Sequence, residues 1–387
     1  MRLSRLSLYC IIFSLLSCKS DIKKEIDSNL KQAGPLVDIP INLEDFNELY
    51  FTSIFDSLHY ILLDSNDSLP LVGNMKTIIE GNNIYIEDNE LNNLHQFDLK
   101  GKIKSIFKSS GEGPGQFLQI EDFIVKNDTV IIYDRRLGKL IYFDTSASYI
   151  KEKSEKAGAT NFNISDEYTL FFFSGYANSS GNIFLRKSKK NASSSFYPLP
   201  ANSNRGAVRL LHGFVENKKT KEISITIPYT YDVAILDSLG NLTDTRRFSF
   251  LNIPPEDPEN SSSQPSKVNV YFPIQNQVWI SQFFNRKGYH FLLNGKNKIS
   301  YQSNNLRNDI DGVNFFFYPV AKTDNCLVFY THSTILFNLY QNSQDEIKEK
   351  FPNAGIHQFV KDHRIELTDD RHVLIFLKFK DSLKPLL

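Results

Sequence analysis

The sequence has few of the residues from which covalent cross-links and metal centres are built. Only 3 cysteines occur in 387 residues, and Cys10 and Cys18 both lie at the extreme N-terminus. Cys326 alone remains in the part expected to fold, so no disulfide framework is possible. A lone cysteine in a strand-like run such as 325–330 is typically a small buried hydrophobic residue. The 8 histidines show no zinc-binding spacing, and we expect neither a metal nor a cofactor.

An excess of charge of one sign is also lacking. The chain has 44 Lys and Arg against 44 Asp and Glu, mixed along its length. Proteins that bind nucleic acid present clustered basic residues to the phosphates. We therefore expect no nucleic-acid partner.

No hydrophobic run is long enough to span a bilayer as a helix, which takes about 20 apolar residues. Arg2 and Arg5 precede a short apolar run over 6–16, which is typical of a signal peptide at residues 1–17. The run ends in Leu15-Leu16-Ser17-Cys18, which resembles the bacterial lipobox. This resemblance implies that Cys18 is diacylated and becomes the first residue after cleavage, and two acyl chains anchor a protein firmly. We predict a lipid-anchored protein of the cell envelope, on the periplasmic or surface face of the outer membrane.

Motifs of catalysis and phosphate binding are missing as well. There is no Gly-x-Ser-x-Gly elbow and no recognisable acid and base pair. The loop Gly111-Glu112-Gly113-Pro114-Gly115 is rich in glycine, but no Lys-Ser/Thr follows and no helix opens there, as a P-loop requires. We interpret Gly111, Gly113, Pro114 and Gly115 as a tight connection between structural units.

What the sequence does contain is a repeat of strand-like segments. The runs 83–88 and 129–134 are alike, and 46 positions separate Asp88 from Asp134 and also Phe97 from Phe143. A third match over 233–240 places Asp237 93 positions beyond Asp144, or two periods with one unit between. A period of 40 to 50 residues with several short strands is typical of a β-propeller, whose blades pack face to face around an axis.

The aromatic content of 13%, with 31 Phe and 18 Tyr, suits such an all-β protein. We predict a polar linker over 18–44 and a propeller over 45–387, with six blades favoured and seven possible. Further strand sets are expected at 168–186, 223–250, 268–301 and 315–340, and a short helix over 343–351 before Pro352. The apolar runs 58–63 and 372–379 are the candidates for closing the ring.

Several of these segments together resemble a family. The loop 111–117, the run 97–101, the early run 56–63 and the late turn 308–312 are similar to those of six-bladed β-propeller lipoproteins of Gram-negative bacteria. The resemblance covers nearly the whole chain and implies fold and location, because the biochemical role of the family is poorly defined.

The late turn contains Asp309-x-Asp311-Gly312, which invites comparison with a calcium loop. In the register of an EF-hand, however, the first ligand position is Arg307 and the twelfth is Tyr318. We interpret Asp309, Asp311 and Gly312 as a turn.

Two functions remain open. A lipid-anchored propeller without catalytic motifs favours a binding module, with a glycan or an envelope protein held over the central channel. Aromatic clusters at 229–231, 279–284 and 315–318 could supply stacking surfaces, although most aromatic residues in strands belong to the core. The alternative is a hydrolase or lyase that acts on a polymer through residues on separate loops. The sequence does not single out ligand-binding residues.

Overall fold

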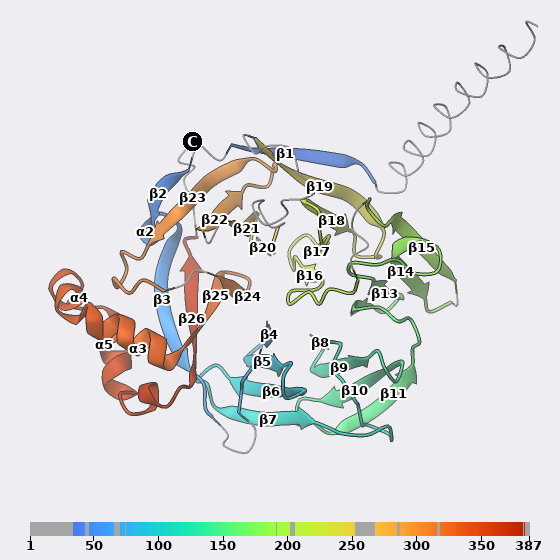
Figure 1. Cartoon of the computed structure of the whole chain (residues 1–387), viewed down its shortest axis with the longest axis horizontal. Helices are drawn as coiled ribbons and strands as arrows, with labels where there is room; N and C mark the ends of the chain where they lie inside the picture. The colour runs from blue at the N-terminus through green and yellow to red at the C-terminus, as the bar shows by residue number, and fades with distance from the viewer. Residues whose placement is uncertain are drawn as a thin grey trace, which may run out of the picture.

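A computed structural model of the chain describes residues 34–42, 46–65, 70–73, 75–190, 192–201, 206–251, 268–284, 287–315, 318–381 and 383. Its strands form six sheets arranged around a central axis (Figure 1). Each sheet is one blade, and the blades follow one another along the chain. The predicted six-bladed β-propeller is confirmed.

We number the blades in chain order and give their strands from the axis outward. Blade 1 contains β4 (Met75–Glu80), β5 (Asn83–Asp88), β6 (Asn93–Asp98) and β7 (Ile103–Lys108); blade 2 contains β8 (Asp122–Lys126), β9 (Thr129–Asp134), β10 (Lys139–Asp144) and β11 (Tyr149–Ser154); blade 3 contains β12 (Asn161–Ile164), β13 (Tyr168–Phe172), β14 (Asn182–Ser188) and β15 (Ser193–Pro198).

The second half of the ring uses strands from both ends of the chain. Blade 4 contains β16 (Val215–Glu216), β17 (Ile223–Thr226), β18 (Asp232–Leu236), β19 (Leu242–Leu251) and β1 (Leu36–Asn42); blade 5 contains β20 (Val270–Ile274), β21 (Gln277–Phe284), β22 (Lys287–Leu293), β23 (Ile299–Arg307) and β2 (Asn47–Tyr50); blade 6 contains β24 (Pro319–Lys322), β25 (Cys326–His332), β26 (His372–Phe379) and β3 (Phe55–Leu62). A four-residue helix, α2 (Phe51–Ile54), joins β2 to β3.

Strand alternation explains how the blades pack. In β9, Val130 and Ile132 face the apolar cluster shared with blade 1, whereas Ile131 and Tyr133 face the cluster shared with blade 3. Side chains alternate between the two faces of a strand, so consecutive apolar residues cover both faces of the blade. Each face is then buried against a neighbouring blade. Six such clusters occur among the described residues, one at each junction between neighbouring blades.

A repeated hairpin accounts for the period seen in the sequence. The Oδ1 atom of Asp98 accepts hydrogen bonds from the backbone N–H groups of Lys100 and Lys102 at 2.8 and 2.9 Å. Gly101 has a φ of 83°, which glycine adopts without steric cost. The same turn follows the third strand of three other blades, at Asp144, Asp237 and Asn294.

The ring closes as expected, because β3 from the start of the chain pairs antiparallel with β26 from its end. Cys326 lies in β25, is 8% exposed and forms no disulfide, as predicted. The helix predicted near 343–351 is present as α4 (Gln344–Lys350).

The linker boundary is corrected by β1. The sequence placed residues 18–44 in a polar linker, but Leu36–Asn42 form a strand that pairs in parallel with β19. Ile39 and Ile41 are 2% and 0% exposed and join the apolar cluster between blades 4 and 5. The propeller therefore begins before residue 45, and its first strand adds to a blade more than 200 residues further along the chain.

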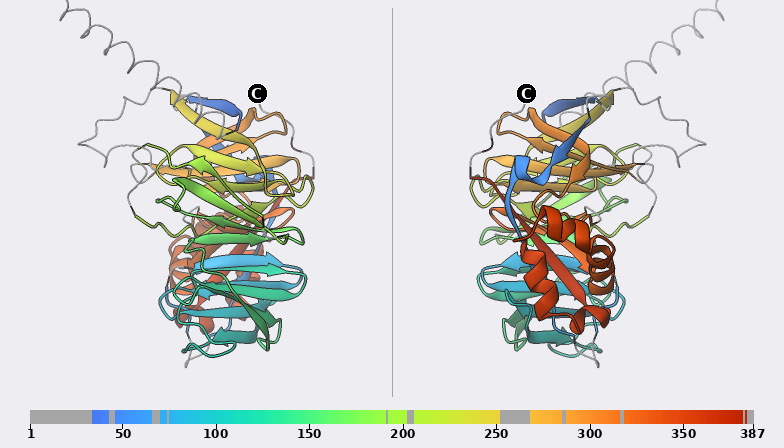
Figure 2. Two further views of the ribbon diagram at one scale, coloured as in Figure 1. Left: turned by 90° about the vertical axis from the view of Figure 1, so that its right-hand side faces the viewer. Right: turned by 90° about the vertical axis from the view of Figure 1, so that its left-hand side faces the viewer.

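The expected strand set at 315–340 is also corrected. After β25 the chain forms α3 (Ser333–Asn342), α4, α5 (Gly355–Asp362) and the 3-10 helix η2 (Glu366–Thr368) before it returns as β26. Figure 2 shows this helical insertion on the outer side of blade 6. Leu336, Tyr340 and Ile356 pack on the cluster between blades 5 and 6, so the insertion extends an existing core.

Candidate functional site

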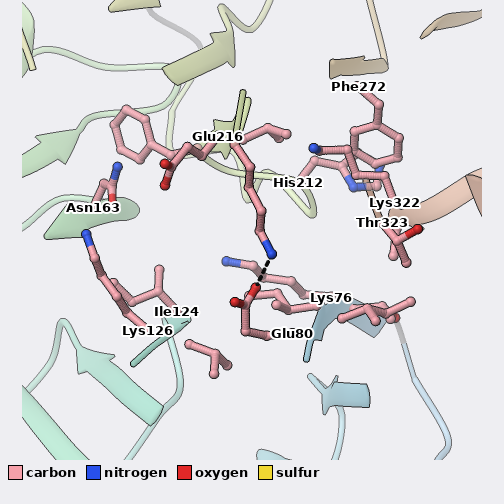
Figure 3. Close-up of a pocket in the computed structure, with 18 of the residues that line it drawn as sticks. Lys76, Glu80, Ile124, Lys126, Asn163, His212, Glu216, Phe272, Lys322 and Thr323 are labelled. Carbon is pink, nitrogen blue, oxygen red and sulfur yellow. Dashed lines mark ion pairs between the residues drawn. The ribbon is translucent and has the colours of Figure 1, made fainter. Parts of the chain in front are cut away.

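The innermost strands of all six blades surround one pocket of about 550 Å³ on the axis. Figure 3 shows the side chains that project into it. The pocket extends along the ends of β4, β8, β16 and β24, where Glu80, Lys126, Glu216 and Lys322 stand. We call this end of the channel the mouth.

The other end of the channel is crossed by residues 206–214, between blades 3 and 4. Arg209 in this segment reaches the carbonyl oxygen of Ile120 in blade 2 at 3.3 Å. His212 lies with its ring centroid 4.8 Å from that of Phe272 in blade 5 and lines the pocket. Because the segment contacts blades on both sides of the axis, it forms the inner wall of the pocket. We call this end of the channel the closed end.

Lys76 lines the depth of the pocket, and its ammonium group is paired with Asp122. The Lys76 ammonium lies 2.5 Å from Asp122 Oδ1 and 2.7 Å from the carbonyl oxygen of Phe123, and both charged side chains are almost fully buried. Asp122 Oδ2 accepts a hydrogen bond from the backbone N–H of Phe162 at 3.0 Å. A buried ion pair whose remaining atoms are also bonded is a structural feature, and here it joins blades 1, 2 and 3.

His212 beside this pair is held neutral. Burial, together with the positive charge of Lys76, lowers the pKa of His212 to about 4. The wall near the axis is thus a neutral imidazole beside an aromatic ring, while the charged groups available to solvent stand at the mouth.

Four further lysines line the mouth, and they differ in their partners. Lys218 pairs with Glu80 at 3.1 Å, and Lys221 lies 3.8 Å from Glu216. Lys126 donates only to the carbonyl oxygen of Ile164, at 2.9 Å. Within the described part of the chain, the Lys322 side chain makes neither a hydrogen bond nor an ion pair. Among the described residues, Lys126 and Lys322 therefore have no carboxylate at ion-pair distance.

Lys322 has the most unusual environment of these. Burial lowers the pKa of Lys322 to about 8, and Asp324 nearby opposes this effect only in part. Desolvation favours the neutral amine over the ammonium. The nearby carboxylates therefore stabilise the charged form of Lys322 by less than burial destabilises it.

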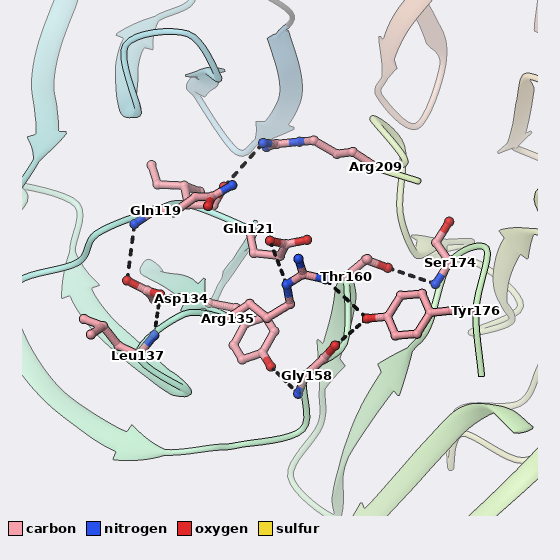
Figure 4. Close-up of polar contacts among 12 residues, drawn as sticks. Gln119, Glu121, Asp134, Arg135, Leu137, Gly158, Thr160, Ser174, Tyr176 and Arg209 are labelled. Carbon is pink, nitrogen blue, oxygen red and sulfur yellow. Dashed lines mark hydrogen bonds and ion pairs between the residues drawn. The ribbon is translucent and has the colours of Figure 1, made fainter. Parts of the chain in front are cut away.

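The closed end carries charges that are paired with one another (Figure 4). Arg209 pairs with Glu87 and Asn89, and Arg135 lies 3.3 Å from Glu121. Burial raises the pKa of Glu87 to about 7, and Arg209 opposes this shift. Burial also raises the pKa of Glu121, with Arg135 acting against it.

Two aspartates that recur in the sequence fasten the inter-blade loops at this end. Asp134 Oδ2 accepts from the backbone N–H of Leu118 at 2.7 Å, and its Oδ1 accepts from that of Leu137 at 2.8 Å. Asp88 binds Val72, Glu90 and Leu91 in the same way. Both are fully buried, so their repetition reflects blade geometry.

The glycine-rich loop lies between blades 1 and 2. Its carbonyl oxygens bind the ammonium group of Lys139. The carbonyl oxygen of Gly113 accepts a hydrogen bond from Lys139 at 3.0 Å, and that of Glu112 accepts one at 3.3 Å. Gly115 has a φ of 70°, and a Cβ there would lie 2.8 Å from the Tyr149 ring. Gly111 and Pro114 belong to the same connection. The loop is remote from the pocket.

The turn at Asn308 to Val313 is likewise structural. Asp311 accepts from Tyr60 Oη at 2.6 Å and from the backbone N–H of Val313 at 3.1 Å. Asp309 instead accepts from the backbone N–H of Thr52 at 2.9 Å, and Gly312 has a φ of 78°. The two carboxylates thus bind different partners. In the described ranges no group of three or more His, Cys, Asp or Glu side chains could hold a metal ion.

The aromatic clusters proposed as stacking surfaces do not form the pocket. Trp279 is 1% exposed in the core between blades 5 and 6, and Phe315 packs on the same core. Tyr231 packs against the cluster between blades 4 and 5. Phe316 and Phe317 lie outside the described residues. Tyr318 lies close to the pocket wall, with its ring centroid 6.2 Å from that of His212.

The pocket residues were not identified from the sequence, although they recur with the 46-residue period. Lys126 lies 46 positions after Glu80, and Asp122 lies 46 positions after Lys76. Each pair occupies equivalent places on the innermost strands of blades 1 and 2. Extending the period from the strand ends to these inner positions would have indicated which charged residues face the axis.

Cys18 and the signal peptide lie outside the described residues, so lipidation remains a prediction. None of the helices in the described ranges is long and apolar enough to cross a membrane.

The fold and the axial pocket define a six-bladed propeller with a channel open at one end. Residues 33–330 match the family described as 6-bladed beta-propeller, DUF5128, and the chain belongs to this family. No curated protein matches the sequence.

Solved structures are similar in fold. A Bacteroides fragilis protein described as exported is 15% identical, with a TM-score of 0.66 over 89% of this chain and 100% of that chain. A DUF4221 member from Bacteroides vulgatus is 10% identical, with a TM-score of 0.49 over 84% of this chain and 97% of that chain.

Proposed function

We propose that this propeller is an exported binding protein that holds a glycan or a segment of another envelope protein in the mouth of its channel. The observation that carries this proposal is the pocket of about 550 Å³ to which all six blades contribute. Ligand sites are commonly clefts of roughly 300–1,000 Å³ with a few convergent polar groups. Lys126 and Lys322 are such groups, because neither is paired with a carboxylate in the described part of the chain.

Binding is favoured over catalysis by the way the charges are arranged. The buried pair at the depth of the pocket, Lys76 and Asp122, is bonded to the backbone on both sides and is not available to a substrate. The charges that solvent reaches are lysines and carboxylates around the rim, which suit hydrogen bonding to a polar ligand. The glycine-rich loop and the Asp309 turn are used within the fold.

The proposed lipid anchor at Cys18 would also orient the pocket. The carbonyl oxygen of Pro35 accepts from the backbone N–H of Thr245, and Gly34 lies beside Leu242 at the start of β19. β19 follows a third-strand hairpin, and these hairpins stand at the same end of the blades as the mouth. Cys18 precedes Gly34 by 16 positions, so at most roughly 55 Å of fully extended chain would separate the anchor from the mouth end of the blades. An anchored propeller would therefore keep its mouth close to the membrane.

A blocking variant tests the proposed binding site. The full chain is screened against an array of bacterial envelope glycans and against solubilised envelope proteins, and any ligand found is measured again with Asn163→Trp, which fills the pocket. Ser238→Trp, in an exposed hairpin, serves as the control. We expect Asn163→Trp to abolish binding and the control to retain it. Equal binding by both variants, or no ligand at all, contradicts the proposal.

The anchor has a separate test. Membrane fractionation of cells that express the wild type and Cys18→Ala should place the first in the membrane fraction and the second in the soluble fraction. Membrane association of both proteins would show that Cys18 does not carry the anchor.

A further inference from the structure

We infer that the ligand is an acidic glycan, and that a carboxylate of a uronic acid residue binds the ammonium group of Lys322 at the mouth of the pocket. This inference rests on the proposed function and deepens it, because it names the chemical class that the site selects. The lysines around the channel differ in whether a carboxylate of the protein neutralises them.

Five lysines line the pocket, and the protein itself neutralises three of them. Lys76 is paired with Asp122, Lys218 with Glu80, and Lys221 lies within 4 Å of Glu216. The remaining two, Lys126 and Lys322, face no carboxylate at ion-pair distance in the part of the chain that the structure describes. The mouth therefore presents positive charge that an anionic ligand can complete.

The position of Lys322 suits a bound anion. Its side chain is half-buried at the end of β24, where Thr323 and Asp324 begin the following turn. A buried ammonium without a partner is costly, because it loses hydration and gains no ion pair. A carboxylate at this point would form a charge-assisted hydrogen bond in partly desolvated surroundings, where such bonds are strongest. The lowered pKa of Lys322 is a consequence of the same desolvation.

Lys126 stands across the pocket from Lys322. Figure 3 shows Lys126 beside Asn163 on one side, with Lys322 near His212 and Phe272 on the other. Lys126 donates to a neutral carbonyl, so it keeps its positive charge and further donor capacity. A ligand that repeats an acidic unit can place one carboxylate near each lysine, which a single small anion cannot do.

The rim carboxylates favour a sugar over an acidic peptide. Glu80, Glu216 and Asp324 line the same pocket as the lysines. Ionised carboxylates only accept hydrogen bonds, and sugar hydroxyl groups can donate to them while also accepting from lysine and asparagine. An acidic peptide would bring its own carboxylates towards these oxygens, with one backbone N–H donor per residue, whereas a sugar unit offers several hydroxyl donors. The mixed rim thus fits a polyhydroxylated acid.

Isothermal titration of the full chain with three probes tests this inference. The probes are an oligogalacturonate, its methyl ester, which is neutral but otherwise matched, and a tetraglutamate peptide. Each is titrated into the wild type, Lys322→Met, Lys126→Met and, as the control, Lys296→Met, whose lysine lies in a hairpin outside the pocket. Circular dichroism establishes that every variant is folded.

We expect the oligogalacturonate to bind the wild type at least tenfold more tightly than its methyl ester. Lys322→Met should weaken this binding at least tenfold, Lys126→Met by a smaller factor, and Lys296→Met by less than twofold. The wild-type affinity should also fall as the pH rises through about 8, since Lys322 then loses its proton, and Lys322→Met should lack this dependence.

Other results overturn the inference in distinguishable ways. Equal affinity for the acid and its ester, both abolished by Asn163→Trp, would exclude recognition of the carboxylate but leave the pocket as a glycan site. Binding of tetraglutamate in place of the sugar would exclude the glycan class. No binding of any probe, together with no hit in the ligand screen, would contradict the proposed function as well.

Discussion

The two ends of the channel use charged residues in opposite ways. At the closed end, Arg209 is bonded to Glu87 and Asn89, and Arg135 is paired with Glu121. At the mouth, Lys322 is half-buried without an ion pair in the described part of the chain, and Lys126 contacts only a carbonyl oxygen. The same ring of blades therefore pairs these charged groups with one another at one end, and at the other end leaves two lysines without a carboxylate at ion-pair distance among the described residues.

This difference indicates where stability and binding reside. Breaking a buried pair leaves an uncompensated group and destabilises the fold, so the closed-end residues should matter for folding. A desolvated lysine without a partner costs stability in the absence of ligand, and proteins retain such groups where function needs them. Substitutions at the two ends should then change the free energy of unfolding in opposite directions.

The largest expected effect comes from Asp134, which fastens the loop at the closed end. Asp134→Ala removes a fully buried carboxylate that accepts several backbone hydrogen bonds, and it leaves those partly buried N–H groups without their acceptor. We expect a loss of about 3–4 kcal/mol in urea unfolding. Asp237→Ala, in a hairpin at the mouth end, should cost less than about 1 kcal/mol because water can replace its bonds. Equal losses would contradict the assignment of the two ends.

Arg209 should have the next largest effect. Arg209→Met removes the partner of Glu87, which is 0% exposed, and breaks the contact between segment 206–214 and blade 1. We expect a loss of roughly 2–3 kcal/mol, below the full cost of a buried charge because Glu87 can take up a proton. Arg364→Met, on the exposed part of the helical insertion, is the matched control. An unchanged urea midpoint for Arg209→Met would show that the closed end is not held by this pair.

The stability contribution of the closed end should also depend on pH. The pKa of Glu87 is raised to about 7 in the folded protein, so its contribution is present at low pH and is lost as the pH rises through 7. Glu87→Gln should therefore gain about 2 kcal/mol relative to the wild type between pH 5 and pH 7. Glu90→Gln, an exposed neighbour, should show no such gain. Parallel pH profiles for Glu87→Gln and the wild type would contradict a raised pKa at the closed end.

The fold could be predicted from the sequence where it depends on local pattern. Strand alternation and the turn of Asp98 and Gly101 repeat with the blade, so the period revealed the propeller and its order. β3 and β26 were found as closing strands because both are strongly apolar. The role of β1 could not be found in this way, since its residues become a strand only against the edge of β19, which is distant in sequence.

The helical insertion and the pocket were missed for different reasons. The apolar residues of α3 recur with helical spacing, at Ile335, Leu336, Leu339 and Tyr340. They directly follow the apolar strand β25, so the two segments were predicted as one set of strands. The pocket takes its charged residues from blades 1, 2, 4 and 6, and no local motif marks such a set. The 46-residue spacing of Glu80 and Lys126 relates only blades 1 and 2, and which lysines lack partners depends on the whole ring.

The central claim, that charge is left unpaired at the mouth for a ligand, is tested most directly by the stability of Lys322→Met without ligand. The measurement is the free energy of unfolding in urea at pH 7, compared with the wild type and with Lys296→Met. We predict that Lys322→Met is more stable by about 1 kcal/mol, because methionine keeps the side-chain volume and removes a poorly solvated charge. Lys296→Met should be neutral. A loss of stability in Lys322→Met would show that the ammonium serves the fold, and would contradict the account.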